Sequence, residues 1–168
     1  MDAVICGIDP GLGITGYAVL RVSGATSQIL DAGVCRFEKR PPLSERLLAV
    51  HRDVSEILTE HRPDIVAVED LYAHYNHPRT AILMGHARGV ILHAAAAAGI
   101  DVRSYGATRI KRFLTGNGHA SKSQMQRAVQ VALNLDALPE PNDVADALAI
   151  ALCCASETAQ PTTPGACA

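Results

Sequence analysis

The sequence predicts a single α/β domain with a mixed five-stranded sheet flanked by helices. Three apolar, strand-like segments follow one another at the N-terminus with short glycine-bearing or polar connections, which favours antiparallel neighbours. Two further apolar segments each follow a helical pattern, as strands joined by crossover helices do. The C-terminal third then shows helical patterns only. These observations together indicate three antiparallel strands followed by alternating helices and strands.

The first half of the chain is expected to hold four strands and one helix. The strands are predicted at residues 3–8, 14–22, 29–36 and 65–68. A polar connection at 23–27 separates the second strand from the third. Pro41 and Pro42 then interrupt the chain, and Ser44 is expected to cap a helix that runs to about residue 60. The fourth strand is continuously apolar, as expected for a strand buried on both faces.

The second half is predicted to hold four helices and the fifth strand. The first of these helices ends near residue 98, and the second spans 108–114. The third begins at residue 121 and the fourth at residue 142, and the strand covers 102–105. Gly99 suits the left-handed position after a helix, and Ser121 with Gln124 forms a capping-box pattern. Residues 1–157 are therefore expected to form one domain, and 158–168 a disordered tail.

The composition excludes several classes of protein. Of the 168 residues, 48% are hydrophobic and 19% are charged, as in an ordinary soluble domain. No apolar run approaches the roughly 18 residues of a membrane span, and the N-terminus lacks a basic-then-apolar signal. The five cysteines, without zinc spacing, predict reduced thiols in a cytoplasmic protein: Cys6, Cys35, Cys153, Cys154 and Cys167.

The charge of the chain is unevenly distributed. The formal net charge is −2, but residues 71–130 contain eight basic residues and one acid, Asp101, so this segment is +7 and the remainder −9. The basic residues are Arg79, Arg88, Arg103, Arg109, Lys111, Arg112, Lys122 and Arg127. A stretch of one sign within a nearly neutral chain indicates a surface that faces a polyanion, although chance clustering on solvated helices gives the same count.

Four carboxylates occupy positions where the backbone fixes a side chain. Asp9 ends the first strand and Glu69 ends the fourth. Asp143 and Asp146 are three residues apart at the start of the last helix, so they share a helix face. If these side chains converge, they form a site for hard divalent cations, and two such cations can cleave phosphodiesters. Separately, each acid has an ordinary role as a turn former or a partner of a helix dipole.

Two other motifs point to weaker alternatives. Residues 11–16 match G-x-G-x-x-G, but the segment that follows has strand character, whereas a dinucleotide site needs a helix there. A glycine hairpin beside Asp9 is the favoured interpretation. His74 and His77 resemble half of a zinc site, but no second pair of ligands accompanies them.

The motifs together resemble the RuvC family of bacterial Holliday-junction resolvases. The matching segments are GIDPGLGITGYAV (7–19), VE (68–69), GHARG (85–89), KSQ (122–124) and DVADALAI (143–150). The resemblance extends from residue 3 to about 155. It implies a ribonuclease-H-like fold, a homodimer and Mg²⁺- or Mn²⁺-dependent nicking of two opposed strands at a four-way junction. It also implies two ions per active site and cooperation with the RuvA–RuvB branch-migration complex.

Residue roles follow from the same resemblance. Asp9, Glu69, Asp143 and Asp146 match the catalytic, metal-binding acids of the family. Tyr72 stands where the family has an aromatic residue that contacts junction bases. Lys111 and Lys122 match phosphate-contacting lysines, and Arg79, Arg109 and Arg112 are expected to hold the DNA arms by salt-sensitive contacts.

Three other functions share parts of this pattern. A ribonuclease-H-like nuclease that acts on RNA or RNA–DNA hybrids would use the same carboxylates. Actin-like phosphotransferases also end their first strand in Gly-x-Asp, but they need two such domains, for which 168 residues are too few. A catalytically silent DNA-binding module would not need the complete set of acids.

Close packing of the helix at 79–98 through Gly85 and Gly89 is the expected mode of dimerisation.

Overall fold

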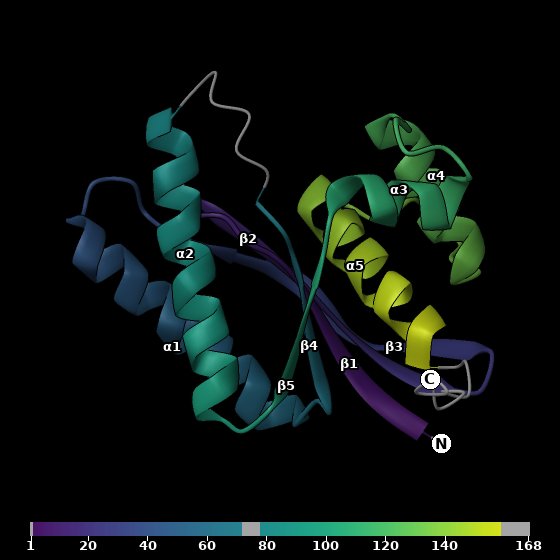
Figure 1. Cartoon of the computed structure of the whole chain (residues 1–168), viewed down its shortest axis with the longest axis horizontal. Helices are drawn as coiled ribbons and strands as arrows, with labels where there is room; N and C mark the ends of the chain where they lie inside the picture. The colour runs from purple at the N-terminus through teal and green to yellow at the C-terminus, as the bar shows by residue number, and fades with distance from the viewer. Residues whose placement is uncertain (1, 72–77, 159–168) are drawn as a thin grey trace, which may run out of the picture.

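The computed structural model describes residues 2–71 and 78–158, which contain one mixed sheet in the order β3-β2-β1-β4-β5 (Figure 1). The strands are β1 (Asp2–Asp9), β2 (Ile14–Ser23), β3 (Thr26–Arg36), β4 (Ile65–Glu69) and β5 (Asp101–Tyr105). β1 to β3 are antiparallel neighbours, whereas β4 pairs in parallel with both β1 and β5. The predicted mixed sheet with three antiparallel first strands is therefore confirmed.

The connection between β2 and β3 is shorter than the sequence suggested. Ser23 pairs with Thr26, so only Gly24 and Ala25 join the two strands. Gly24 has a φ of 58°, a conformation that glycine adopts without steric cost. The prediction of a polar connection over 23–27 was wrong because these residues lie at the exposed end of the antiparallel strands β1 to β3, where pairing does not require apolar side chains.

Five helices in the described residues cover both faces of the sheet (Figure 1). They are α1 (Leu43–His61), α2 (Pro78–Ala97), α3 (Ala107–Thr115), α4 (Lys122–Ala132) and α5 (Asn142–Thr158). α1 and α2 lie on one face, and α5 lies on the other with α3 and α4 packed beside it. Alternate residues of β1 serve the two cores: Ile5 packs with α5, whereas Cys6 and Ile8 pack with α1 and α2.

The ends of the helices confirm most of the expected signals. Ser121 and Gln124 form both hydrogen bonds of the capping box, and Gly99 follows α2 with a φ of 72°. Ser44, however, lies inside α1 and does not cap it. The carbonyl of Pro42 accepts the N–H groups of Glu45 and Arg46, so the helix starts directly after the two prolines without a side-chain cap.

Three further expectations concern membrane-spanning segments, the cysteines and the C-terminal tail. Among the helices of residues 2–71 and 78–158, none is long and apolar enough to cross a membrane. Cys6, Cys35, Cys153 and Cys154 are buried free thiols, as the cysteine pattern predicted. α5 continues to Thr158, and the expected tail beyond it lies outside the described residues.

Candidate active site

Two carboxylates lie at the same edge of the sheet because their strands are parallel neighbours. Asp9 is the last residue of β1 and Glu69 is the last residue of β4. Ile8 pairs with Val68, so the next residue of each strand reaches the same level. The four residues before each acid are buried, which fixes the backbone from which these side chains extend. The sheet therefore presents two acids side by side.

Close packing of α5 brings the other two acids to this edge. A methyl group on Gly7 would overlap the carbonyl oxygen of Ala147, and one on Gly16 would overlap the carbonyl oxygen of Asp143. Only residues without a side chain allow the helix to approach β1 and β2 so closely. Asp143 and Asp146 start this helix and are half-buried beside its packed side.

Burial and mutual repulsion raise the pKa values of three of these acids above their ordinary values. Burial, and then the charges of Glu69, Asp146 and Asp143, raise the pKa of Asp9 from 3.8 to about 7. Burial is also the largest cause that raises the pKa of Glu69 and of Asp146. Lys122 lowers all three, and Lys111 lowers those of Glu69 and Asp146. The four acids therefore lie within electrostatic range of one another, and Lys111 and Lys122 lie within range of them.

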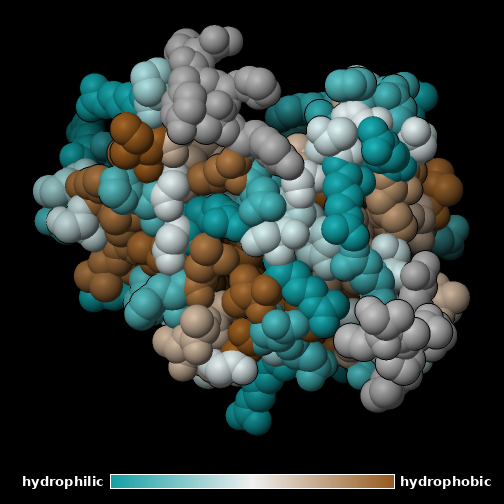
Figure 2. Space-filling view, in the orientation of Figure 1, coloured by the Kyte–Doolittle hydropathy of each residue, from teal (hydrophilic) through white to brown (hydrophobic). Residues whose placement is uncertain are grey.

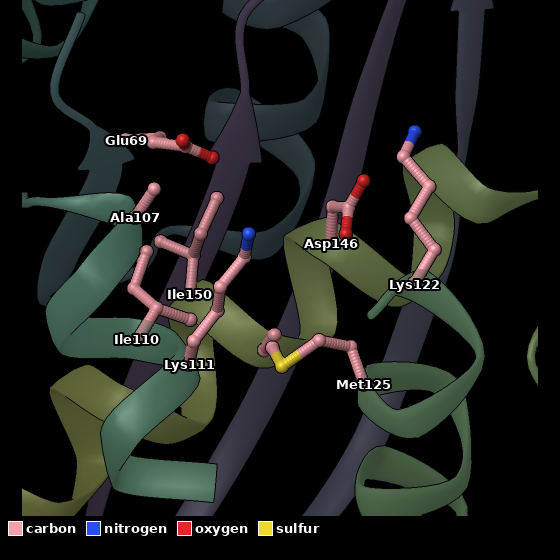
Figure 3. Close-up of a pocket in the computed structure, with 9 residues that line it drawn as sticks. Glu69, Ala107, Ile110, Lys111, Lys122, Met125, Asp146 and Ile150 are labelled. Carbon is pink, nitrogen blue, oxygen red and sulfur yellow. The ribbon is translucent and has the colours of Figure 1, made fainter. Parts of the chain in front are cut away.

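A pocket of about 180 Å³ opens beside the acids (Figure 3). Glu69, Asp146, Lys111 and Lys122 line this pocket, and their charged ends lie in the upper part of the view in Figure 3. The other residues that line the pocket are apolar: Ile110, Met125 and Ile150, with Ala107 and Ala149. An apolar floor lowers the local dielectric and so strengthens every charge interaction above it.

The turn that follows Asp9 is held by residues that the sequence did not single out. Thr15 is fully buried, donates to the carbonyl of Gly11 at 2.7 Å and accepts the Gly11 N–H at 3.2 Å. This turn joins β1 to β2, which confirms a glycine hairpin in place of the helix that a dinucleotide site requires. The sequence signal that could have indicated this turn is a threonine four residues after a glycine.

Arg88 of α2 fixes the end of β4. Its Nε donates to the carbonyl oxygen of Glu69 at 3.0 Å, and its Nη2 donates to Asp70 Oδ1 at 2.8 Å and to Ser104 Oγ at 2.7 Å. The backbone of Glu69 is therefore fixed by a side chain from a residue 19 positions away in the sequence. No spacing in the sequence pairs Arg88 with β4, so only the folded chain reveals this role.

The basic segment is less available than the sequence count implies. Arg88 pairs with Asp70, Arg103 pairs with Asp101 at 3.0 Å, and Arg109 pairs with Glu157. Arg109 also lies over the ring of Tyr105, 5.3 Å from its centroid. Three of the eight counted cations thus have internal acidic partners, which reduces the net charge offered to a polyanion.

The other candidate DNA contacts differ in position. Arg79 is exposed in the first turn of α2, and Arg112 is exposed on α3 beside a second hollow that Asp70, Arg109 and Phe113 also line. Tyr72 and the pair His74 and His77 lie outside the described residues. The structure therefore places the lysines at the acids and leaves the aromatic candidate untested.

Metal binding rests on the chemistry of the donors. Carboxylate oxygens are the ligands that Mg²⁺ and Mn²⁺ prefer, and a cation would relieve the repulsion that raises the pKa of Asp9. Within residues 2–71 and 78–158, no three side chains of His, Cys, Asp or Glu have the spacing of a formed metal site. The acids fit a hard divalent ion by type and charge.

Comparisons with known proteins agree on one family. The sequence model described as crossover junction endodeoxyribonuclease RuvC matches residues 5–154. A protein of that description from Rhodopirellula baltica is 54% identical over 149 residues, covering 89% of this chain and 84% of that protein. Thermus thermophilus RuvC in complex with a Holliday junction substrate aligns with a TM-score of 0.87 at 37% identity, covering 94% and 95% of the two chains. A second Thermus thermophilus RuvC structure gives a TM-score of 0.81 at 38% identity and covers 89% and 92%.

Proposed function

Because the chain belongs to the RuvC family of crossover junction endodeoxyribonucleases, we propose that it resolves Holliday junctions by hydrolysing one phosphodiester in each of two opposed strands. The fold agrees with this family, which confirms the ribonuclease-H-like α/β class. The observation that carries the proposal is the position of four acids at one sheet edge, where burial first, and then the charges of the other three acids, raise the pKa of Asp9 to about 7. The expected products have 5′-phosphate and 3′-hydroxyl ends.

We infer that Asp9, Glu69, Asp143 and Asp146 hold two Mg²⁺ or Mn²⁺ ions. Bound ions supply an activated water and a stabilised leaving oxygen. Asp9 is the natural shared ligand, because it extends from a rigid strand end and feels the charges of the other three acids. Arg88 and Thr15 orient the backbone on which Glu69 and Asp9 stand.

Lys111 and Lys122 face the same space as the acids and would contact backbone phosphates of the DNA. Lys122 lowers the pKa of Asp9 and lies at the start of α4, so it is the candidate beside the scissile phosphate. Arg79, Arg109 and Arg112 would hold the junction arms by contacts without sequence preference. Tyr72 follows Glu69 by three residues and would stack on an unpaired base.

The assembly that we propose is a homodimer formed through α2. Figure 2 shows hydrophobic residues along α2 at the surface, and Ile82 of this helix is 60% exposed. A methyl group on Gly85 or Gly89 would meet no atom within 4 Å, so this side of the helix is open. Two-fold symmetry would match two opposed junction strands. Action in the bacterial cytoplasm, together with the RuvA–RuvB complex, belongs to the same proposal.

The test compares substrates and metals with one preparation. A synthetic four-way junction should be nicked symmetrically in Mg²⁺ or Mn²⁺, with no nicking when EDTA replaces the metal. Linear duplex of the same sequence and an RNA–DNA hybrid serve as matched substrates. Preferential cleavage of the hybrid would favour the alternative, a ribonuclease-H-like nuclease that acts on RNA. Equal cleavage of linear duplex and junction would remove junction selectivity from the proposal.

A further inference from the structure

A second group of basic residues lies outside the positive segment at 71–130. The chain has 15 Lys and Arg residues, eight of them in that segment, and five of the other seven fall between residues 36 and 52. They are Arg36, Lys39, Arg40, Arg46 and Arg52. The net charge of the residues outside 71–130 does not reveal this group, because the acids among those residues outnumber the bases. Its position in the fold gives it significance.

Two of these residues abut the turn that follows Asp9. The Phe37 N–H donates to the carbonyl of Gly13 at 2.9 Å, so the start of this basic group is fastened to the turn. Lys39 extends along it: its Cε lies 3.8 Å from the point where a Cβ on Gly13 would stand. From the other side, Arg46 Nη2 donates to the carbonyl of Leu12 at 2.8 Å. Both cations therefore border the catalytic edge.

Arg46 has hydrogen-bonding capacity to spare. Its Nε is buried and has no hydrogen-bond partner among the described residues. Because that nitrogen is buried, a phosphate would be bound by the terminal Nη groups. The bond to Leu12 uses one of their N–H donors, and the half-exposed side chain keeps others for a phosphate. A hollow of about 440 Å³ opens at this residue, with Arg36 and Arg52 also in its lining. Glu38, Glu45 and Asp53 line it as well, so the hollow is mixed in charge, and Lys39 and Arg46 are the cations nearest the turn.

Basic residues therefore lie on both sides of this part of the sheet edge, at the acids on one side and at the turn that follows Asp9 on the other. Lys111 and Lys122 extend from α3 and α4 on the α5 side of the sheet. Lys39 and Arg46 reach the same edge from the α1 side, through the segment between β3 and α1 and the first turn of α1. A single basic wall would hold a strand on one side of its scissile phosphate only. Two walls would hold the strand on both sides and so fix it across the acids.

We propose that Lys39 and Arg46 bind backbone phosphates of the cleaved DNA strand, on the opposite side of the acids from Lys111 and Lys122. This inference rests on the proposed function, since it assigns a further part of the same DNA path. Arg46 has a second task there: its bond to Leu12 couples phosphate binding to the turn that follows Asp9. Lys39 has no such structural task and reports on DNA contact alone.

The test measures junction binding without cleavage. The Asp9→Asn protein provides the background, and the dissociation constant for a synthetic four-way junction is followed as salt is raised. Adding Lys39→Ala should weaken binding about 3- to 10-fold at moderate salt and lower the slope of log K against log salt by roughly 0.7 to 0.9, the value of one lost phosphate contact. Arg46→Gln should lower the slope by the same amount. Thermal unfolding of each variant controls for folding.

Arg21→Ala is the matched control. Arg21 is exposed on β2 and pairs with Val4, at the far end of the ladder in which Asp9 pairs with Gly16. This variant should keep the parent slope. If folded Lys39→Ala also keeps the parent slope, the second wall does not contact DNA and the inference fails, while junction binding by the parent leaves the proposed function intact. If the Asp9→Asn parent binds junctions no better than linear duplex, the proposed function fails and the inference fails with it.

Discussion

Two helices of this chain carry many small residues, and they use them in opposite ways. In α5, the residues from Val144 to Ala155 are nearly all buried, and Gly7 and Gly16 of the sheet allow its backbone to touch the strands. In α2, Gly85 and Gly89 face open space, and Ile82 is 60% exposed. A run of small residues therefore indicates close packing only where the facing surface is also known.

The difference matters for the proposed active site, because α5 contributes two of its acids and α2 contributes none. Close approach of α5 places Asp143 and Asp146 near Asp9, and their charges add to burial and to the charge of Glu69 in raising the pKa of Asp9. α2 contributes to the site only from behind, through Arg88. One helix thus supplies charge to the site, whereas the other positions its backbone and keeps a free surface.

The largest expected effect concerns the purpose of this crowding. Asp9→Asn preserves the size of the side chain but removes the charge that divalent ions need, so cleavage of a four-way junction should fall by about 10³-fold or more. Junction binding should be retained or strengthened, because one repulsive charge is lost. Single-turnover cleavage in Mg²⁺ and equilibrium binding in EDTA measure the two effects. Cleavage at the wild-type rate would show that the acids crowd together for another reason.

The same variant should alter the pH dependence of stability. The folded chain binds a proton at Asp9 up to about pH 7, whereas the unfolded chain loses it near pH 3.8. The free energy of unfolding of the metal-free protein therefore falls as pH rises from about 4 to 7. Asparagine cannot ionise, so Asp9→Asn should be more stable than wild type at pH 8, by roughly 1–3 kcal/mol, and nearly equal at pH 4. Urea unfolding at the two pH values gives the comparison.

Next in size is the packing of α5. Gly16→Ala would push a methyl group into the carbonyl of Asp143, where neither backbone can yield without moving the helix. We expect a loss of about 3 kcal/mol or more in the free energy of unfolding, together with reduced cleavage. Gly85→Ala is the matched control, because its methyl group meets nothing. Equal stability of the two variants would contradict the contrast between the helices.

The succession of strands and helices along the chain and the two strand-end acids were predictable from the sequence for a physical reason. Continuous apolar segments such as 65–68 indicate buried strands, and a carboxylate directly after such a strand has a fixed place at a sheet edge. Asp9 and Glu69 were found in this way. Ser44 was misplaced because two prolines can start a helix without a capping side chain, which a residue pattern does not distinguish.

Features that depend on contacts between distant segments were not predictable. Arg88 was counted as a surface cation, yet it holds the Glu69 carbonyl. The roles of Gly7 and Gly16 depend on how closely α5 approaches, which no local pattern encodes. Lys39 and Arg46 were hidden because an average of charge over a long segment ignores which residues meet at one turn.

The lysines on the α5 side of the sheet should separate by function. Lys122→Ala should lower both junction affinity and the single-turnover rate at saturating enzyme, by roughly 10- to 100-fold in rate, because Lys122 lies near Asp9. Lys111→Ala should mainly weaken binding and lower the salt slope by about one unit. Rates measured at saturation and a salt titration distinguish the two. Identical, purely binding defects would remove Lys122 from the catalytic centre.

A smaller effect is expected where α2 supports the site. Arg88→Lys keeps a positive charge but loses the fork that joins the Glu69 carbonyl to Asp70 and Ser104. Cleavage should fall about 10-fold at saturating enzyme, with junction affinity unchanged, because Arg88 positions Glu69 and does not face DNA. Arg21→Lys, at an exposed position of β2 away from the acids, is the control for rate. A binding defect in Arg88→Lys would instead place Arg88 on the DNA path.

The smallest effect tests the free surface of α2. Alanine is favoured over glycine in a helix by about 0.5–1 kcal/mol, and a methyl group on Gly85 or Gly89 meets no atom of the described chain. At low protein concentration, Gly85→Ala and Gly89→Ala should therefore raise the melting temperature slightly. If α2 is the dimer surface, the added methyl groups should also separate the two helices and shift sedimentation towards monomer at micromolar concentration. A stabilised chain that still dimerises like wild type would place the dimer contact elsewhere, and a destabilised chain would mean that α2 has a packing partner within its own chain.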